Sequence, residues 1–294
     1  MVTLGPKSQQ RAIGYGVMAV LMWSTVATAF KLSLEYLSPA PLLLIATAAS
    51  WLFLLFYVIT TGRWSAIRQR PLNNSLRGLT LGLINPALYY LLLFSAYDRL
   101  PAQQAMAINY TWALTLGLIA IPVLGQSWQT KAVLAALLSY AGVLVIATDG
   151  DLLNLHLTEP VGTALALLST LLWAGYWLIG ARDTQEPVSA LLLNFTGALP
   201  PMLLWVVSDP PASWPLPGII GGLYIGLIEM GLSFVCWLTA MRLAQNTLQV
   251  SSLIFLSPPL SLLFIWALLD EPILAPTLIG LGFILAGLLI QQRR

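Results

Sequence analysis

The sequence predicts an all-α polytopic membrane protein, with ten transmembrane helices arranged as two inverted five-helix repeats. Three observations predict this fold class: the apolar composition, the length of the apolar runs and an internal repeat. Of the 294 residues, 58% are hydrophobic and only 8% are charged, and the mean hydropathy is +0.83. Soluble domains carry about 25% charged residues, so a soluble core would not absorb this much apolar surface.

The apolar runs have the length that a bilayer requires, about 20 residues each. Charged residues cluster between the runs, and the connecting segments are too short to form a soluble domain. Backbone polar groups inside lipid need partners within their own segment, so we expect each run to be a helix. The predicted spans are 13–34, 40–61, 76–98, 101–123, 130–148, 160–181, 187–208, 217–242, 246–269 and 273–291.

The first span is expected to be an uncleaved helix. Lys7 and Arg11 precede an apolar run that is followed by Ala27-Thr28-Ala29, which superficially fits a secretory signal peptide. The run is, however, as long as the later spans and opens a series of them. Cys236 is the single cysteine, which excludes an intrachain disulfide and predicts a small buried apolar residue.

Basic residues predict the orientation of the chain. Ten spans place both termini on one side, and the loops of that side carry eleven of the thirteen Lys and Arg residues. Only Lys31 and Arg99 lie on the other side. The positive-inside rule therefore predicts cytoplasmic termini and an external 149–159 loop. Because the membrane topology accounts for the basic residues, the net charge of +2 predicts no nucleic-acid partner.

The chain reads as a duplication, with residues 1–149 as the first five-helix repeat and 150–294 as the second. Segment 21–24 resembles 171–174, segment 77–88 resembles 221–232, and segment 140–146 resembles 285–290, always in the same order. Five spans is an odd number, so the second half enters the membrane from the opposite side. Inverted repeats are a common transporter plan in which the substrate binds near the midplane at the repeat interface. We therefore expect transport.

Glu229 is the acid that lies near the middle of a predicted span, and Asn85 is its repeat mate. Helical spacing places Glu229 on a stripe with Gly222, Gly226 and Ser233, which predicts a close helix crossing at one end and a polar face at the other. An acid at a helix centre costs about 2.5–3.5 kcal/mol, so something must compensate it. Glu229 either contacts substrate or a coupled proton, or is a protonated structural residue. Asn85 either contacts a ligand or joins two helices.

Prolines and aromatic residues inside the spans also suggest a cavity. Pro86, Pro200-Pro201 and Pro258-Pro259 each remove a backbone donor, which is tolerated beside a cavity or at a simple kink. Rings with a polar tip suit a cavity that accepts a partly apolar ligand. The rings expected to line it are those of Trp23, Tyr89, Tyr110, Trp112 and Trp173.

Several residue types are missing from the spans. No Lys or Arg lies at the middle of any span, which argues against carriers of phosphate esters or nucleotide sugars. A single acid among rings suits a cation or a zwitterion with an ammonium group. His156, Asp149 and Asp151 share a loop that resembles no metal site, and we find no nucleophile–base pair. We therefore predict no metal, no cofactor and no enzymatic activity.

The two halves resemble tandem EamA domains of the drug/metabolite transporter superfamily, over nearly the whole chain. The segments "LMWST" at 21–25 and "INYTWALTL" at 108–116, followed by "GQ" at 125–126, are more similar to the YddG-type aromatic amino-acid exporters of bacterial inner membranes. The superfamily often has Gly-Glu before each half's last helix, where this chain has Gly125-Gln126 and Asp270-Glu271. The resemblance implies a ten-helix basket with helices 3, 4, 8 and 9 near its centre, and export of Phe, Tyr and Trp.

These inferences combine into one prediction, a secondary exporter of amino acids in a bacterial inner (plasma) membrane. Its cavity would be built from spans 1, 3, 4, 6, 8 and 9, and one half would rock against the other. Glu229 would contact the ammonium or carry a proton, and Asn85, Asn109 and Ser233 would supply hydrogen bonds. A broader amino-acid or amphipathic-cation exporter is the alternative within this class, and a membrane-embedded enzyme is the alternative outside it. A monomer suffices for the fold, and no oligomeric state is predicted.

Overall fold

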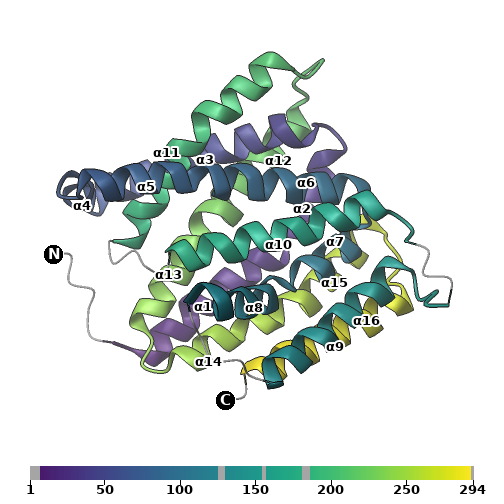
Figure 1. Ribbon diagram of the computed structural model, residues 1–294. Coiled ribbons are helices and arrows are strands. Elements are labelled where there is room, and N and C mark those ends of the chain that lie inside the picture. Colours follow the sequence, from purple (N-terminus) through teal and green to yellow (C-terminus); the bar gives the residue numbers. More distant parts are fainter. Residues whose placement is uncertain (1–6, 125–129, 154–156, 181–185, 293–294) are drawn as a thin grey trace.

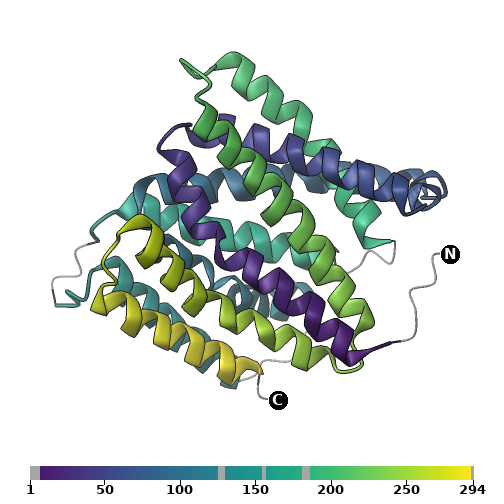
Figure 2. The same cartoon turned by 180° about the vertical axis from the view of Figure 1, so that it is seen from behind.

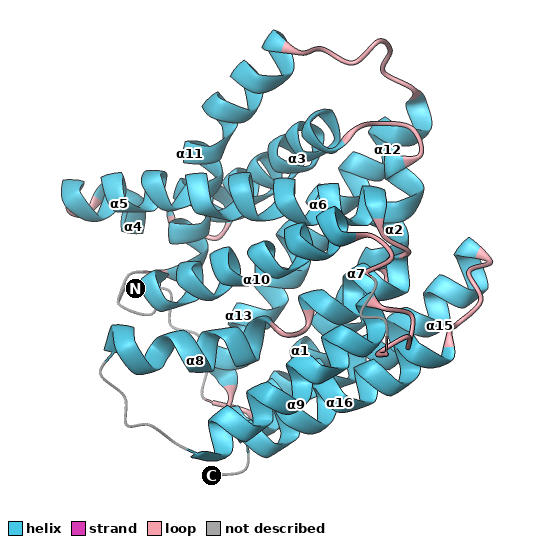
Figure 3. Ribbon diagram, turned by 45° about the vertical axis from the view of Figure 1, so that its right-hand side comes forward, coloured by secondary structure: helices cyan, strands magenta, loops and turns pink. Residues whose placement is uncertain are grey.

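The computed structural model describes residues 7–124, 130–153, 157–180 and 186–292, and all regular elements in these ranges are helices (Figure 3). Ten helical segments cross the molecule one after another (Figure 1). The first five are α1–α2 (Gln9–Ser24, Val26–Leu34), α3 (Pro39–Thr60), α5–η1–α6 (Leu72–Gly82, Leu83–Leu88, Tyr89–Arg99), α7–α8 (Ala102–Asn109, Trp112–Leu124) and α9 (Thr130–Ala147). The last five are α10 (Pro160–Gly180), α11 (Pro187–Ser208), α12–η2–α13 (Leu216–Tyr224, Ile225–Leu232, Ser233–Leu243), α14–η3–α15 (Thr247–Ser251, Ser252–Leu256, Ser257–Leu269) and α16 (Ala275–Gln292). A short helix, α4 (Trp64–Arg68), joins the second segment to the third.

The ten segments confirm the predicted all-α membrane fold. Within the described ranges, seven of them are long and apolar enough to cross a bilayer. Two others are shorter apolar helices, Val133–Ala147 and Ala275–Ile290. The remaining segment, α7–α8, is divided at Tyr110-Thr111, so neither part reaches full length. The Gly125-Gln126 motif and His156 lie outside the described residues.

Large apolar side chains cover the outside of the bundle. Leu204 on α11 is 71% exposed and Phe56 on α3 is 68% exposed, and Leu, Ile, Val and Trp side chains on the other segments behave similarly. A surface of this kind would be unfavourable in water and is favourable against lipid chains. The protein is therefore a multi-pass membrane protein.

Glycine crossings reveal the relation between the two halves. At the crossing of α9 and α16, a Cβ on Gly142 would collide with the carbonyl oxygen of Gly280, and a Cβ on Gly287 would collide with that of Ala135. Gly142 and Gly287 are repeat mates 145 residues apart, and so are Ala135 and Gly280. The same contact therefore occurs twice, once in each direction, as an inverted repeat requires.

A second glycine crossing also occurs twice, once with the glycine in each half. Gly82 on α5 has no room for a Cβ because the carbonyl oxygen of Asn194 on α11 lies against it. Gly226 in η2 meets the carbonyl oxygen of Ala46 on α3 in the same way. Small residues let membrane helices approach this closely, and α3 and α11 are corresponding elements of the two repeats.

The third segment of each half is interrupted at its middle. Asn85 adopts extended backbone angles of φ −138° and ψ 120° within η1, and Pro86 follows it. In the second half, η2 is a π-helical stretch that contains Glu229. The hydroxyl of Ser233 donates to the carbonyl oxygen of Glu229, which compensates for the irregular backbone there. Broken helices at corresponding positions of inverted repeats are typical of substrate sites.

The fourth segments are interrupted as well. Tyr110-Thr111 separates α7 from α8, and the 3₁₀ helix η3 separates α14 from α15. Pro258-Pro259 occupies the first turn of α15, where the missing backbone donors cost little. Pro200-Pro201, by contrast, lies inside the continuous helix α11.

One end of the bundle contains the start of α1 and the end of α16, and we call it the terminal end (Figure 2). The opposite end, where α2, α6, α9 and α15 finish, is the distal end. At the terminal end, Glu186 accepts from Arg63 at 2.8 Å and pairs with Arg242 at 3.0 Å, which joins the two halves. Burial raises the pKa of Glu186, but hydrogen bonds from Ser189 and the two guanidinium charges outweigh it and lower the pKa below its ordinary value.

The glycine crossings predict a stability difference within one helix. Gly280→Val should destabilise the protein by about 1–3 kcal/mol, because the new side chain meets Gly142 and Ile146. Gly282→Val is the matched control on the same helix, since nothing lies within 4 Å of its Cβ position. Thermal unfolding in detergent should show a lower midpoint for the first variant alone. Equal midpoints for the two variants would contradict the crossing.

Candidate functional site

A cavity of about 660 Å³ lies at the middle of the bundle. Side chains from both halves line it, contributed by the first, third and fourth segments and by the sixth, eighth, ninth and tenth. Nearly half of the lining residues are aromatic. The volume falls in the range of about 300–1,000 Å³ that small-molecule sites occupy.

Trp173 is the centre of one wall. Its ring stacks on Tyr89 with 4.5 Å between centroids and on Tyr176 with 5.6 Å. Trp112 and Trp177 meet the same indole edge-on at 6.3 and 5.9 Å. These rings come from three different segments, so they fix one another's orientation.

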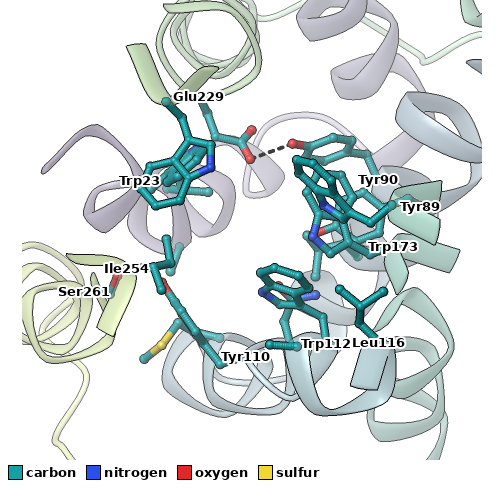
Figure 4. A pocket seen from close by; sticks show the side chains of 18 of the residues that line it. Trp23, Tyr89, Tyr90, Tyr110, Trp112, Leu116, Trp173, Glu229, Ile254 and Ser261 are labelled. Carbon is teal, nitrogen blue, oxygen red and sulfur yellow. Dashed lines mark hydrogen bonds between the residues drawn. The ribbon is translucent and has the colours of Figure 1, made fainter. Parts of the chain in front are cut away.

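Trp23 forms the facing wall, on the opposite side of the hollow in Figure 4. Its ring lies 5.7 Å from Phe234 and 5.4 Å from Trp237. Trp23 and Trp173 are repeat mates, 150 residues apart in the sequence. The inverted repeat thus presents one indole to the cavity from each half.

Glu229 is the single charged side chain among the described residues that line the cavity. Its side chain projects from η2 and is 6% exposed. The Tyr90 hydroxyl donates to its Oε1 at 2.8 Å, as the dashed line in Figure 4 marks. Its other oxygen, Oε2, has no hydrogen-bond partner among the described residues.

The single hydrogen bond from Tyr90 does not fully offset the cost of burying the Glu229 carboxylate. A carboxylate at the middle of a membrane costs about 2.5–3.5 kcal/mol. One hydrogen bond to a charged group returns about 1.5–3 kcal/mol, and no cation faces the acid from the cavity lining. The ionised carboxylate therefore lacks a partner that a ligand cation or a proton would supply.

Several other polar groups of this region bond to one another, although the buried Trp177 Nε1 has no partner among the described residues. Asn109 donates to Ser169 at 3.2 Å, and Ser169 donates in turn to a carbonyl of its own helix. Thr115 bonds the Tyr140 hydroxyl at 2.7 Å. These bonds join the fourth segment to its neighbours, which positions Tyr110 and Trp112 at the cavity.

Of the nine predicted site residues, seven line this cavity: Trp23, Tyr89, Asn109, Tyr110, Trp112, Trp173 and Glu229. Asn85 and Ser233 do not line it. Asn85 is buried at the break in η1, with its Oδ1 lacking a partner among the described residues, and Ser233 is fully buried against the Glu229 carbonyl. Regular helical spacing placed both residues on the polar face, but η1 and η2 depart from that spacing. Whether the seven bind substrate stays a prediction.

Tyr90 is the main residue that the sequence reasoning left out of the site. Regular spacing from Gly78 and Gly82 selects Tyr89, whereas the break at Asn85 brings Tyr89 and Tyr90 to the cavity together. The adjacent pair of tyrosines was the available signal. Phe234 and Trp237 were missed because they follow the π-helical turn of η2.

In the described part of the chain, no group of three or more His, Cys, Asp or Glu side chains is placed to hold a metal ion. The buried carboxylate of Glu229 stands among rings and hydroxyls instead. Rings and a carboxylate are groups that contact organic cations in protein sites.

Comparison with known proteins gives the family. The profile of the EamA-like transporter family matches residues 10–148 and again 160–291. Protein PecM of Dickeya dadantii is 27% identical over 224 residues, covering 74% of this chain and 73% of its own. The aromatic amino acid exporter YddG of Escherichia coli is 25% identical over 274 residues, covering 90% and 91%. A solved crystal structure shares the fold with a TM-score of 0.65 and 22% identity, over 97% of both chains. With the family profile matched along both halves, the chain belongs to the EamA-like transporter family.

Proposed function

We propose that this transporter exports amino acids, with aromatic side chains preferred, by alternating access. The observation that carries the proposal is the single carboxylate of Glu229 in a cavity lined by rings. The ammonium of an amino acid would pair with Glu229 Oε2, which has no partner among the described residues. The proposed boundary between the two repeats lies between Asp149 and Gly150.

The ring of the cargo would lie between the two indole walls. Trp173 and Trp23 present aromatic surface from opposite sides, and Trp112 adds an edge. Ring pairs of this kind contribute about 0.5–1.5 kcal/mol beyond burial, and an ammonium near an aromatic face gains further. A straight-chain amino acid such as lysine would forgo the ring contacts, which favours aromatic cargo.

The exposed fractions of the side chains that line the cavity support a cavity that is closed at the distal end. Phe30 and Tyr97 are 0% and 4% exposed there, with their rings 5.2 Å apart and edge to face. Toward the terminal end, Trp177, Trp237 and Ile254 are only half-buried. Entry from the terminal end and release at the distal end follow if the halves rock about the glycine crossings.

The relatives and the charge distribution support the direction of transport. Two proteins similar to this chain, from Salmonella typhimurium and Escherichia coli, are named aromatic amino acid exporters. We propose a bacterial inner membrane with both termini in the cytoplasm, because the sequence assigns eleven of the thirteen basic residues to the loops on the side of the termini. Movement from the terminal end to the distal end is then export.

Counterflow in proteoliposomes tests the cargo. L-phenylalanine should exchange, whereas 3-phenylpropionate should not, because it has the same ring without the ammonium that Glu229 would bind. L-lysine should exchange more slowly than L-phenylalanine by about tenfold, the factor that corresponds to about 1.4 kcal/mol. Equal exchange of L-phenylalanine and 3-phenylpropionate would refute the proposed role of the carboxylate.

Cysteine labelling in intact cells tests the orientation. Leu153→Cys in a Cys236→Ala background should react with an impermeant maleimide, because Leu153 is 97% exposed near the distal end. Ser65→Cys, exposed on α4 at the terminal end, is the matched control and should react only after permeabilisation. The opposite pattern would reverse the proposed direction.

A further inference from the structure

A second hollow lies at the distal end, outside the central cavity. Its volume is about 420 Å³, and it is bordered by the end of α2, the junction of α6 with α7, and the 271–274 segment that precedes α16. Two cations, Lys31 and Arg99, and one acid, Glu271, line it. The central cavity contains no cation in its described lining, so the two spaces differ in charge.

Two buried rings of the central cavity lie next to a residue that lines the hollow. Phe30 and Tyr97 both line the central cavity, and they meet edge to face. Lys31 follows Phe30 directly in the chain and donates to the Tyr97 carbonyl oxygen at 2.9 Å. Lys31 is thus linked to both members of this ring pair, to Phe30 as its neighbour in the chain and to Tyr97 by a hydrogen bond.

Lys31 has a donor to spare. Its ammonium donates to the carbonyl oxygens of Tyr97 and Leu100, each at 2.9 Å, and pairs with no carboxylate in the described part of the chain. A lysine ammonium carries three donors, so one is unused. Arg99 is half exposed, and its guanidinium is 3.9 Å from Glu159, the outer limit of an ion pair.

The walls of the hollow are held by hydrogen bonds rather than by loose loops. Gln103 is buried, donates to the Pro272 carbonyl oxygen at 2.9 Å and accepts from the Leu274 N–H at 3.1 Å. Glu271 Oε1 accepts from the Ala102 N–H at 3.2 Å, while its buried Oε2 has no partner in the described ranges. The hollow therefore offers fixed cationic and anionic groups.

We propose that this hollow is an outer subsite that binds the carboxylate of the cargo through Lys31, after the cargo has left Glu229. The inference rests on the proposed function, since it concerns a zwitterion on its way out. When Phe30 and Tyr97 part, the hydrogen bond from Lys31 to the Tyr97 carbonyl oxygen breaks. The carboxylate of the cargo then accepts from the Lys31 ammonium in place of that carbonyl oxygen. Glu229 then recognises the ammonium on one side of the ring pair, and Lys31 recognises the carboxylate on the other.

Paired cargoes test this assignment. Initial counterflow rates are measured for L-phenylalanine and for phenethylamine, which has the same ring and ammonium but no carboxylate. The wild-type protein should prefer L-phenylalanine by about tenfold, since one charge-assisted contact is lost with the amine. Lys31→Gln keeps an N–H donor for the two carbonyl oxygens but removes the charge, and it should erase the preference by slowing L-phenylalanine alone.

Controls separate this subsite from a structural role and from the proposed function. Lys31→Arg should retain the preference, and Lys7→Gln, the same exchange at the terminal end, should change neither rate. A Lys31→Gln protein that slows both cargoes equally would show only a helix-end cation, and an unchanged preference would also overturn the subsite. If the wild-type protein exchanges neither cargo, the proposed function fails and the subsite fails with it.

Discussion

The structure depends on how one carboxylate is accommodated in a membrane interior. Glu229 costs about 2.5–3.5 kcal/mol at such a depth, and the surrounding elements offset only part of this. Tyr90 supplies one hydrogen bond from the opposite repeat, and Ser233 satisfies the backbone at the π-helical turn that carries the acid. The remaining oxygen faces rings and no cation within the described lining. The protein therefore retains an unmet electrostatic requirement, which the ammonium group of the proposed cargo would meet.

Symmetry and asymmetry have separate roles in this chain. The glycine crossings are repeated in both halves, because the two five-helix repeats pack through the same close contacts. The chemistry is not repeated. The mate of Glu229 is Asn85, which is neutral and buried away from the cavity, and the cations of the distal hollow lie beyond the rings that close it. One acid at the centre and cations at one end would give the proposed export path a direction that the symmetric scaffold lacks.

Much of the fold could be predicted from the sequence because lipid imposes simple rules on length and polarity. The ten segments, the repeat and the depth of Glu229 follow from hydropathy and spacing. The site was less accessible, since regular helical spacing fails where η1, η2 and the Tyr110-Thr111 break redirect the side chains. Ser233 and Asn85 were placed on a polar face for that reason, and Tyr90 was missed. The Lys31 hydrogen bonds could not be predicted from the sequence either, because they join residues 66 and 69 positions apart through backbone carbonyl groups.

The central claim is that Glu229 binds the ammonium of the cargo. Equilibrium binding of L-phenylalanine to the purified protein, followed by tryptophan fluorescence, tests it most directly. Glu229→Gln keeps the shape of the side chain and removes its charge, and the account predicts at least about tenfold weaker binding, or about 1.4 kcal/mol. Glu159→Gln, the same exchange at a half-buried acid beside Arg99 at the distal end, should leave the affinity unchanged. Unaltered affinity in Glu229→Gln would contradict the account and leave the acid as a structural partner of Tyr90.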